Sequence, residues 1–110
     1  MAPRTYLLQG TLDLLILRTL TLERQHGWGI ARRIHDLTRG TFDVRPGSMF
    51  PALKRLEERG WVTASWGTSD NGRQAKFYAI TTSGRKQLRT EVAQWRRVSD
   101  GIAWALGRTR

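Results

Sequence analysis

Residues 47–57 read Gly47-Ser48-Met49-Phe50-Pro51-Ala52-Leu53-Lys54-Arg55-Leu56-Glu57, a stretch that favours a short amphipathic helix. Three of its apolar residues share one helix face at i, i+4 and i+7: Met49, Leu53 and Leu56. Ser48 is expected to cap the helix, and Pro51 is expected in the first turn, where its missing N–H removes no intrahelical bond. The helix is expected to end at Arg59, because Gly60 suits the left-handed conformation that often follows a helix.

A β-hairpin is predicted directly after this helix. Apolar residues alternate with polar ones over residues 61–66, and the returning strand covers residues 76–81. Residues 67–72 between them are polar and contain an Asn-Gly turn signal. The hairpin is therefore expected to carry a long polar tip.

Two helices are expected before residue 47. Residues 10–22 carry leucines on almost every side of the helix axis, so part of this helix is expected to meet a second subunit. Residues 27–38 place isoleucines on one face, and Gly40 ends this second helix. Residues 41–44 alternate like a short strand.

A long final helix is predicted from about Thr82 to Leu106. Its inward candidates are spaced alternately by four and three residues: Leu88, Val92, Trp95, Ser99, Ile102 and Leu106. This heptad spacing is typical of helix pairing and predicts a helix that dimerises.

The order of helices and hairpin is the layout of a winged helix-turn-helix. The fold class expected is mainly α, with a two-stranded β wing and a long C-terminal dimerisation helix. The length of 110 residues is that of one domain. Residues 1–81 are expected to form the DNA-binding part and residues 82–110 the dimerisation helix, within one compact unit.

The charge of the chain favours a polyanionic partner. Nineteen Lys and Arg against nine Asp and Glu give a net charge of +10. Residues 39–89, which hold the third helix and the hairpin, carry +6 of it, whereas residues 1–38 and 90–110 carry +2 each. The excess thus lies where a winged helix contacts double-stranded DNA.

The composition also excludes several classes of function. The absence of cysteine excludes a disulfide scaffold, a thiolate zinc site and a cysteine nucleophile, and it fits an intracellular protein. His26 and His35 have no ligand set beside them, and no catalytic or phosphate-binding motif is present, so no enzyme, metal or cofactor is expected. The apolar stretch of residues 12–22 contains two charges and is too short to cross a bilayer. A secretion signal is not expected either.

The stretch of residues 47–57, with Gly60-Trp61-Val62, resembles the G-S-L-Y-P-x-L-x-R-L-E…G-L-I signature of PadR-family transcriptional regulators. Further matches to that family lie in the second helix, the wing and the start of the last helix: Gly27-Trp28-Gly29-Ile30, Gly72-Arg73, Lys76-Phe77-Tyr78, Ile80-Thr81, Gly84-Arg85 and Leu88. The resemblance runs from about Leu7 to Trp95 and is to the smaller, single-C-terminal-helix type.

The resemblance implies a cytoplasmic, homodimeric repressor that binds a pseudo-palindromic DNA operator. It also implies dimerisation through the first and last helices and release of DNA by a small molecule. That this effector is a small aromatic compound is expected from Trp95 rather than from the resemblance, and both its existence and its identity are left open. Phe50 stands where the family usually has tyrosine, so a hydroxyl contact to phosphate is lost. Gln74 and Ala75 stand where arginines are frequent, so the wing is less basic.

The residues expected to contact DNA come from the third helix and the wing: Arg45, Ser48, Phe50, Pro51, Lys54, Arg55, Arg73 and Lys76. Lys54 and Arg55 either contact DNA or form a solvated helix face. Arg73 and Lys76 are expected on phosphates rather than bases. Phe50 packs either in the core or on the DNA backbone.

The residues expected in the dimer interface come from the first and last helices: Leu12, Leu15, Leu88, Val92, Trp95, Ile102 and Leu106. Trp95 has two interpretations, because it either closes this interface or stacks on a planar effector, with Val92 and Ser99 beside it. The simplest role for three other indoles, those of Trp28, Trp61 and Trp66, is structural.

The predicted function is sequence-specific transcriptional regulation. One alternative is an architectural protein that binds nucleic acid without sequence preference. Another is a winged-helix module whose basic face meets an acidic protein. Equal affinity for random and promoter DNA would indicate the first, and weak DNA binding with a shallow salt dependence would indicate the second.

Overall fold

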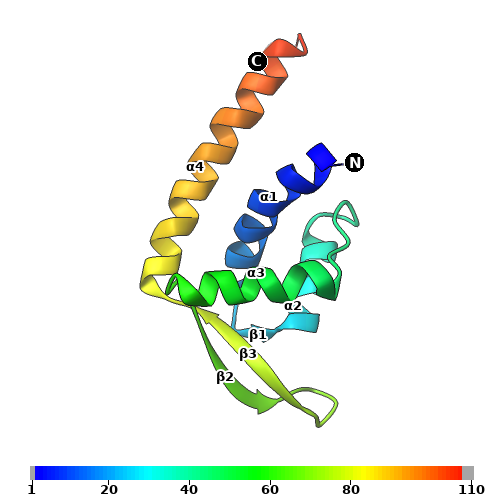
Figure 1. Cartoon of the computed structure of the whole chain (residues 1–110), viewed down its shortest axis with the longest axis vertical. Coiled ribbons are helices and arrows are strands. Elements are labelled where there is room, and N and C mark those ends of the chain that lie inside the picture. Colours follow the sequence, from blue (N-terminus) through cyan, green and yellow to red (C-terminus); the bar gives the residue numbers. More distant parts are fainter. Residues whose placement is uncertain (1, 108–110) are drawn as a thin grey trace.

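The computed structural model describes residues 2–107, with side chains described from residue 10 onward. Within them the elements follow in the order α1 (Ala2–Leu20), β1 (Gln25–His26), α2 (Gly27–Leu37), α3 (Pro46–Glu58), β2 (Val62–Thr68), β3 (Gln74–Ile80) and α4 (Thr82–Ala105) (Figure 1). The strands form one antiparallel sheet in the order β1-β3-β2. This architecture of helices with a β wing confirms the predicted fold class.

The core lies where α1, α2 and α3 meet the base of the sheet. Its buried apolar side chains come from all of these elements: Leu12, Ile16, Leu17, Leu20, Ile30, Ile34, Met49, Ala52, Leu53, Leu56, Val62 and Tyr78. The predicted inward face of α3 is thereby confirmed, since Met49, Leu53 and Leu56 are all buried. Burial of this stripe fixes the rotation of α3 and turns its opposite face to solvent.

The start of α3 differs from the prediction. Pro46 is the first helical residue, and Arg45 occupies the N-cap position without a side-chain hydrogen bond, so the predicted capping role of Ser48 is wrong. The fixed φ of proline suits this first position, which explains the earlier start. Pro51 consequently lies inside the helix rather than in the first turn, and it cannot donate a hydrogen bond to the carbonyl of Gly47.

Two further predictions about the first half of the chain are wrong. α1 begins at Ala2 rather than near residue 10. Residues 41–44 form no strand, and the sheet instead takes its third strand from β1, where Gln25 lies opposite Tyr78. A strand of two residues has no alternation to detect, so only its pairing with β3 reveals it.

His26 joins this strand to the helix that follows. It occupies the N-cap position of α2, where its imidazole Nδ1 accepts a hydrogen bond from the N–H of Gly29 at 3.1 Å. Its ring also meets the ring of Phe77 edge-on, with 5.2 Å between centroids. The start of α2 is thus held by β3.

The base of the wing holds the start of α4. The hydroxyl of Thr81 accepts a hydrogen bond from the N–H of Gly84 at 2.9 Å and so caps the helix. Gly84 lies so close to the backbone carbonyl of Trp61 that a Cβ atom at this position would collide with it. The first turn of α4 is therefore fixed against the strand that opens the wing.

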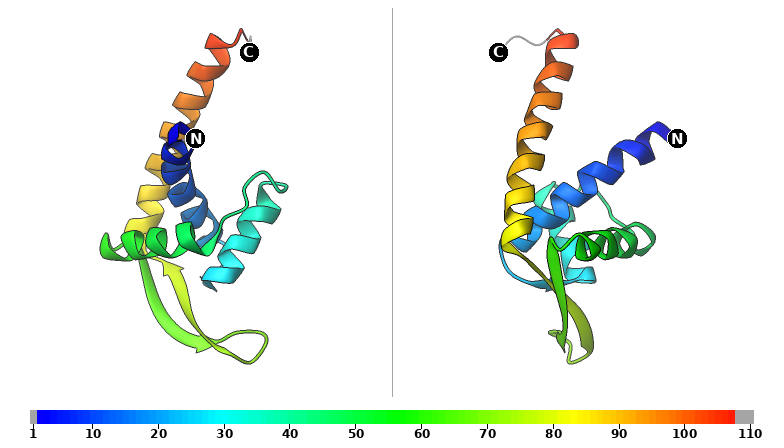
Figure 2. Two further views of the ribbon diagram at one scale, coloured as in Figure 1. Left: turned by 45° about the vertical axis from the view of Figure 1, so that its right-hand side comes forward. Right: turned by 60° about the vertical axis from the view of Figure 1, so that its left-hand side comes forward.

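The molecule is elongated, with principal extents of 51 × 28 × 24 Å. The wing projects to one side of the helices, and α4 projects to the other (Figure 1). α1 and α4 lie together near α3 and diverge toward their far ends (Figure 2). The second half of α4 therefore stands clear of the rest of the single chain.

Candidate nucleic-acid interface

The outward face of α3 is the centre of the candidate interface. Its exposed residues follow one another along the side opposite the core: Gly47, Ser48, Phe50, Pro51 and Lys54. Beside its first turn lies Arg45, which is also exposed. The first turn of a helix has amide groups without intrahelical partners and a positive dipole end, both of which favour a phosphate.

Lys54 and Arg55 are predicted together, but the structure separates them. Lys54 is exposed on the outward face. The guanidinium of Arg55 instead points to α1, where its Nη2 lies 2.7 Å from Oδ1 of Asp13. These side chains are only 27% and 14% exposed. Arg55 thus holds α3 on α1, and its guanidinium is turned toward the protein.

The wing contributes cations at two levels. At its tip, Arg73 has an exposed side chain and follows Gly72, whose φ of +83° turns the loop. Closer to the base, Lys76 lies 3.9 Å from the carboxylate of Glu57 and 5.9 Å from the ring centre of Tyr78. Only Arg73 of this pair is therefore free of a carboxylate partner among the described contacts.

Tyr78 is the residue with a shifted proton affinity in this part of the fold. Burial raises the pKa of its hydroxyl above 10.0, and the nearby carboxylate of Glu57 raises it further. The phenol is therefore neutral at physiological pH. It contributes no charge to the candidate interface.

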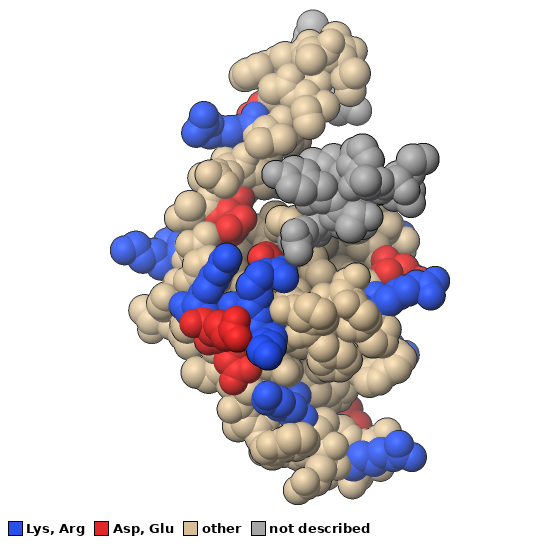
Figure 3. Space-filling view, in the orientation of Figure 1, with Lys and Arg blue, Asp and Glu red and all other residues tan. Residues whose placement is uncertain are grey.

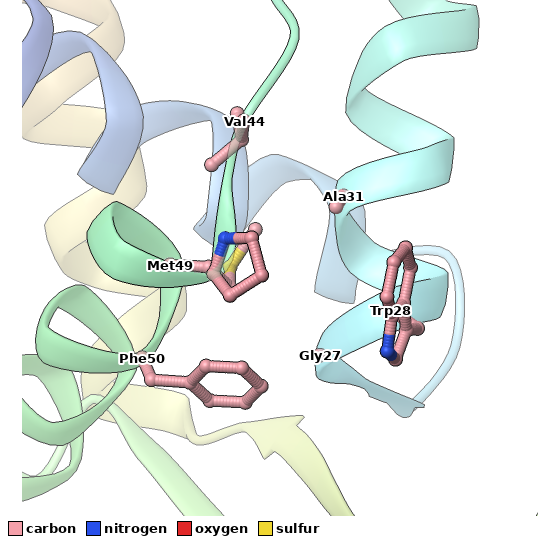
Figure 4. A pocket seen from close by; sticks show the side chains of 7 residues that line it. Gly27, Trp28, Ala31, Val44, Met49 and Phe50 are labelled. Carbon is pink, nitrogen blue, oxygen red and sulfur yellow. The ribbon is translucent and has the colours of Figure 1, made fainter.

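A small apolar hollow opens between α2 and α3. It is lined by Gly27, Trp28, Ala31, Val44, Pro46, Met49 and Phe50. Figure 4 shows the rings of Phe50 and Trp28 on its opposite sides, one extending from α3 and the other from α2. Its volume of about 20 Å³ is that of roughly one water molecule.

The charges are arranged around an uncharged area. In Figure 3, the surface over the first half of α3 carries no charged side chains. Basic side chains lie to the left of this area, over the second half of α3, to the right of it, and below it on the wing. Glu57 and Glu58 at the end of α3 interrupt the basic surface. A polyanion on this face would thus be held at its edges by cations and meet apolar groups between them.

Two of the indoles expected to be structural are exposed instead. Trp28 on α2 is 74% exposed, and Trp66 on β2 is 68% exposed, on the same face of the wing as Lys76. Trp61 is partly buried and packs against the core. No local feature of the sequence separates the two exposed indoles from the partly buried one, because each of the three tryptophans lies next to a glycine.

The residues predicted for the dimer interface divide into two groups. Leu12 is 9% exposed and lies in the core of its own chain, so it offers little surface to a partner. Leu15 and Leu88 also pack against that core, although they are only partly buried. Trp95 and Ile102 on α4, and Leu106 at its C-cap, are at least half exposed. Val92 and Ser99, predicted beside Trp95 at an effector site, are partly exposed.

Within residues 2–107, no three histidine, aspartate or glutamate side chains come together as a metal site would require. The described helices include none that is both long and apolar enough to cross a membrane.

The comparisons with known proteins agree with this geometry. The model of the transcriptional regulator PadR-like family matches residues 16–90. The transcriptional regulator YqjI of Escherichia coli is 29% identical over 93 residues, which are 84% of this chain and 43% of YqjI.

Solved structures show the same fold. A PadR family transcription regulator from Clostridium difficile is 28% identical, with a TM-score of 0.74 over 86% of this chain and 97% of that one. A PadR family transcriptional regulator from Eggerthella lenta is 26% identical, with a TM-score of 0.78 over 98% and 93% of the two chains. The chain belongs to the PadR-like family of transcriptional regulators, whose members bind DNA, and it is not an enzyme.

Proposed function

We propose that the chain is a cytoplasmic, sequence-specific repressor that binds a pseudo-palindromic DNA operator as a homodimer. The observation that carries this proposal is the outward face of α3, with exposed side chains in its first half and the cations Arg45, Lys54 and Arg73 around them. An α-helix fits the major groove, and residues near the start of a recognition helix reach the base edges there. In this arrangement Arg73 at the wing tip contacts a phosphate.

The homodimer is supported by the exposed apolar side chains of α4. Trp95, Ile102 and Leu106 recur at heptad spacing on a part of the helix that its own chain does not cover. These three side chains form a seam along α4, and a second copy packed on this seam would remove them from water. Binding of the two copies of α3 in successive major grooves requires them to lie about 34 Å apart, one turn of the DNA helix.

The effector belongs to the same seam. Trp95 is half exposed, and in a symmetric dimer its symmetry mate would lie near the twofold axis. Two indoles in that position would stack on a planar aromatic compound. Such a compound releases DNA only if it binds more tightly to the dimer in which the two recognition helices have the wrong spacing.

The proposed function is tested by sequencing the DNA fragments that the protein retains from sheared genomic DNA. Enrichment of one inverted repeat, bound at least roughly a thousandfold more tightly than random DNA, supports it. Equal affinity for both indicates an architectural protein. Weak binding with a shallow salt dependence indicates a protein-interaction module.

The effector is tested separately by fluorescence. Planar aromatic or phenolic compounds should quench tryptophan emission and release the operator. Trp95→Ala should abolish the response and leave the dimer intact. Quenching that persists in this variant would place the compound elsewhere, and the absence of any response across a varied panel would leave Trp95 the role of closing the interface.

A further inference from the structure

The hollow between α2 and α3 combines an exposed aromatic ring with a fixed geometry. Phe50 lies on the outward face of α3 and is 48% exposed. Its ring packs on Gly27, where an added Cβ atom would lie 2.8 Å from a ring carbon. Only glycine leaves room for the ring in this position. One part of the Phe50 ring thus packs on Gly27, and another part stays open to solvent.

The wall of the hollow is mainly apolar. Besides Phe50 and Trp28, the side chains that line it are those of Ala31, Val44, Pro46 and Met49 (Figure 4). None of these side chains donates a conventional hydrogen bond into the space. The hollow is therefore suited to a small apolar group, such as a methyl group.

The position of Phe50 on α3 selects the kind of group. It is the fifth residue of the helix, in the half that reaches base edges when a recognition helix enters the major groove. The base edges there present hydrogen-bonding groups and one apolar group, the C5-methyl of thymine. Arg45, Lys54 and Arg73 are exposed, and basic side chains lie beside this surface and on the wing (Figure 3). These cations favour DNA over an apolar protein partner.

We infer that Phe50 recognises a thymine in each operator half-site through its C5-methyl group, which enters the hollow between Phe50 and Trp28. The inference rests on the proposed function, because it assigns a base preference to the same face of α3. Phe50 thereby acts as a specificity-determining residue. Where a tyrosine would offer a hydroxyl contact to phosphate, the phenylalanine ring contributes an apolar contact to a base.

Replacement of thymine by deoxyuridine tests the inference, since it removes the methyl group and leaves the Watson–Crick pair intact. The duplex is the operator selected by the fragment sequencing, with one thymine replaced at a time and affinity measured by fluorescence anisotropy at fixed salt. At one thymine in each half-site, the change should weaken binding of the wild-type protein about fourfold. A duplex with 5-methylcytosine at that position should likewise bind about fourfold more tightly than one with cytosine.

Variants then assign the effect to the ring. Phe50→Ala should weaken binding to the thymine duplex and abolish the difference between thymine and deoxyuridine. Phe50→Leu should retain part of that difference. Leu37→Ala removes a comparably exposed apolar side chain at the far end of α2 and should leave the difference unchanged.

The outcomes separate the inference from the proposed function. Equal binding of operator and random DNA contradicts the proposed function, and with it the inference. If the protein binds the operator selectively but no thymine can be found whose replacement by deoxyuridine weakens binding, the inference alone is contradicted. The same holds if the difference between thymine and deoxyuridine persists in a folded Phe50→Ala protein. The comparison of thymine with deoxyuridine uses the wild-type chain, so it does not depend on how a variant folds.

Discussion

Arg55 of α3 and Asp13 of α1 form an ion pair with 2.7 Å between Nη2 and Oδ1. The pair joins residues 42 positions apart in the chain, and most of both side chains is shielded from solvent. It connects the helix that presents the candidate DNA surface to the helix that carries Leu15 and much of the core. An arginine that the sequence places among the DNA contacts thus serves to position α3.

Loss of this ion pair should destabilise the fold. Arg55→Ala leaves Asp13 with an unpaired, largely buried carboxylate, and we expect the free energy of unfolding to fall by about 1–3 kcal/mol in chemical denaturation. Asp13→Ala should have a similar effect, and the double variant should lose less than the sum of the two. Lys54→Ala, the matched control one residue away, should change stability little. Strict additivity of the two single losses would show that the pair contributes nothing.

Cations at the wing and on α3 should differ in how they affect DNA binding. Arg73→Ala should weaken operator and random DNA alike and reduce the salt slope by about one per protomer, as loss of a phosphate contact does. Lys54→Ala should cost about 1–3 kcal/mol on the operator and relax the preference at one base position. Lys76→Ala should have a smaller effect than Arg73→Ala, because Glu57 already offsets that charge.

Anisotropy titrations at several salt concentrations measure these effects. Arg97→Ala removes an exposed cation from α4, far along the helix from the wing, and serves as the control. If it weakens binding as much as Arg73→Ala does, the proposed DNA surface is on the wrong side of the molecule.

A charge on the seam of α4 should disrupt the proposed dimer. Ile102→Glu would bury an unpaired carboxylate in the interface and weaken association by a few kcal/mol, about a hundredfold or more in the dissociation constant. Sedimentation equilibrium at micromolar concentration should then show monomers, whereas the wild-type chain is expected to be dimeric. Ala93→Glu adds the same charge on the opposite side of the helix and should leave the dimer intact. A monomeric wild-type chain would contradict the proposal.

The raised pKa of Tyr78 predicts a loss of stability in alkaline solution. Well below pH 10.0 the phenol is neutral in both the folded and the unfolded chain, so it adds no pH dependence. Above that pH the unfolded chain ionises first, because the pKa in the fold is higher, and the free energy of unfolding decreases as pH rises. Denaturation across this range should show a shallower decrease for Tyr78→Phe. An equal decrease in both proteins would mean that other groups cause it.

The sequence was sufficient where a pattern repeats along one element. The apolar stripe of α3, the glycine that ends it and the alternation of the two long strands all reflect local periodicity, and each appears in the structure at nearly the predicted residues. Residues 108–110, which the prediction places in the C-terminal segment, lie outside the described part of the chain.

The failures concern interactions between distant residues. β1 is a strand only because Gln25 and His26 lie beside β3, and Arg55 turns inward only because Asp13 lies within reach. Helical periodicity placed Leu12 at a partner interface, although packing in three dimensions covers it within one chain. In the candidate site, the exposed ring of Trp28 and its pairing with Phe50 across the hollow likewise depend on how α2 meets α3.

Because Gly84 packs against the carbonyl of Trp61, α4 can rotate as a rigid rod about this contact and carry motion from one of its ends to the other. Of the 24 residues of the helix, 21 follow Gly84, so the helix extends for about 32 Å from this contact. A rotation of about 5° at this contact would displace the far end by about 3 Å, by simple trigonometry on that length. Conversely, a shift of the far end by the thickness of a small planar ring would reach the wing as a rotation of only a few degrees. The distance between two recognition helices would then respond to events at the opposite end of the molecule through a single stiff element, with no change in the fold of either half.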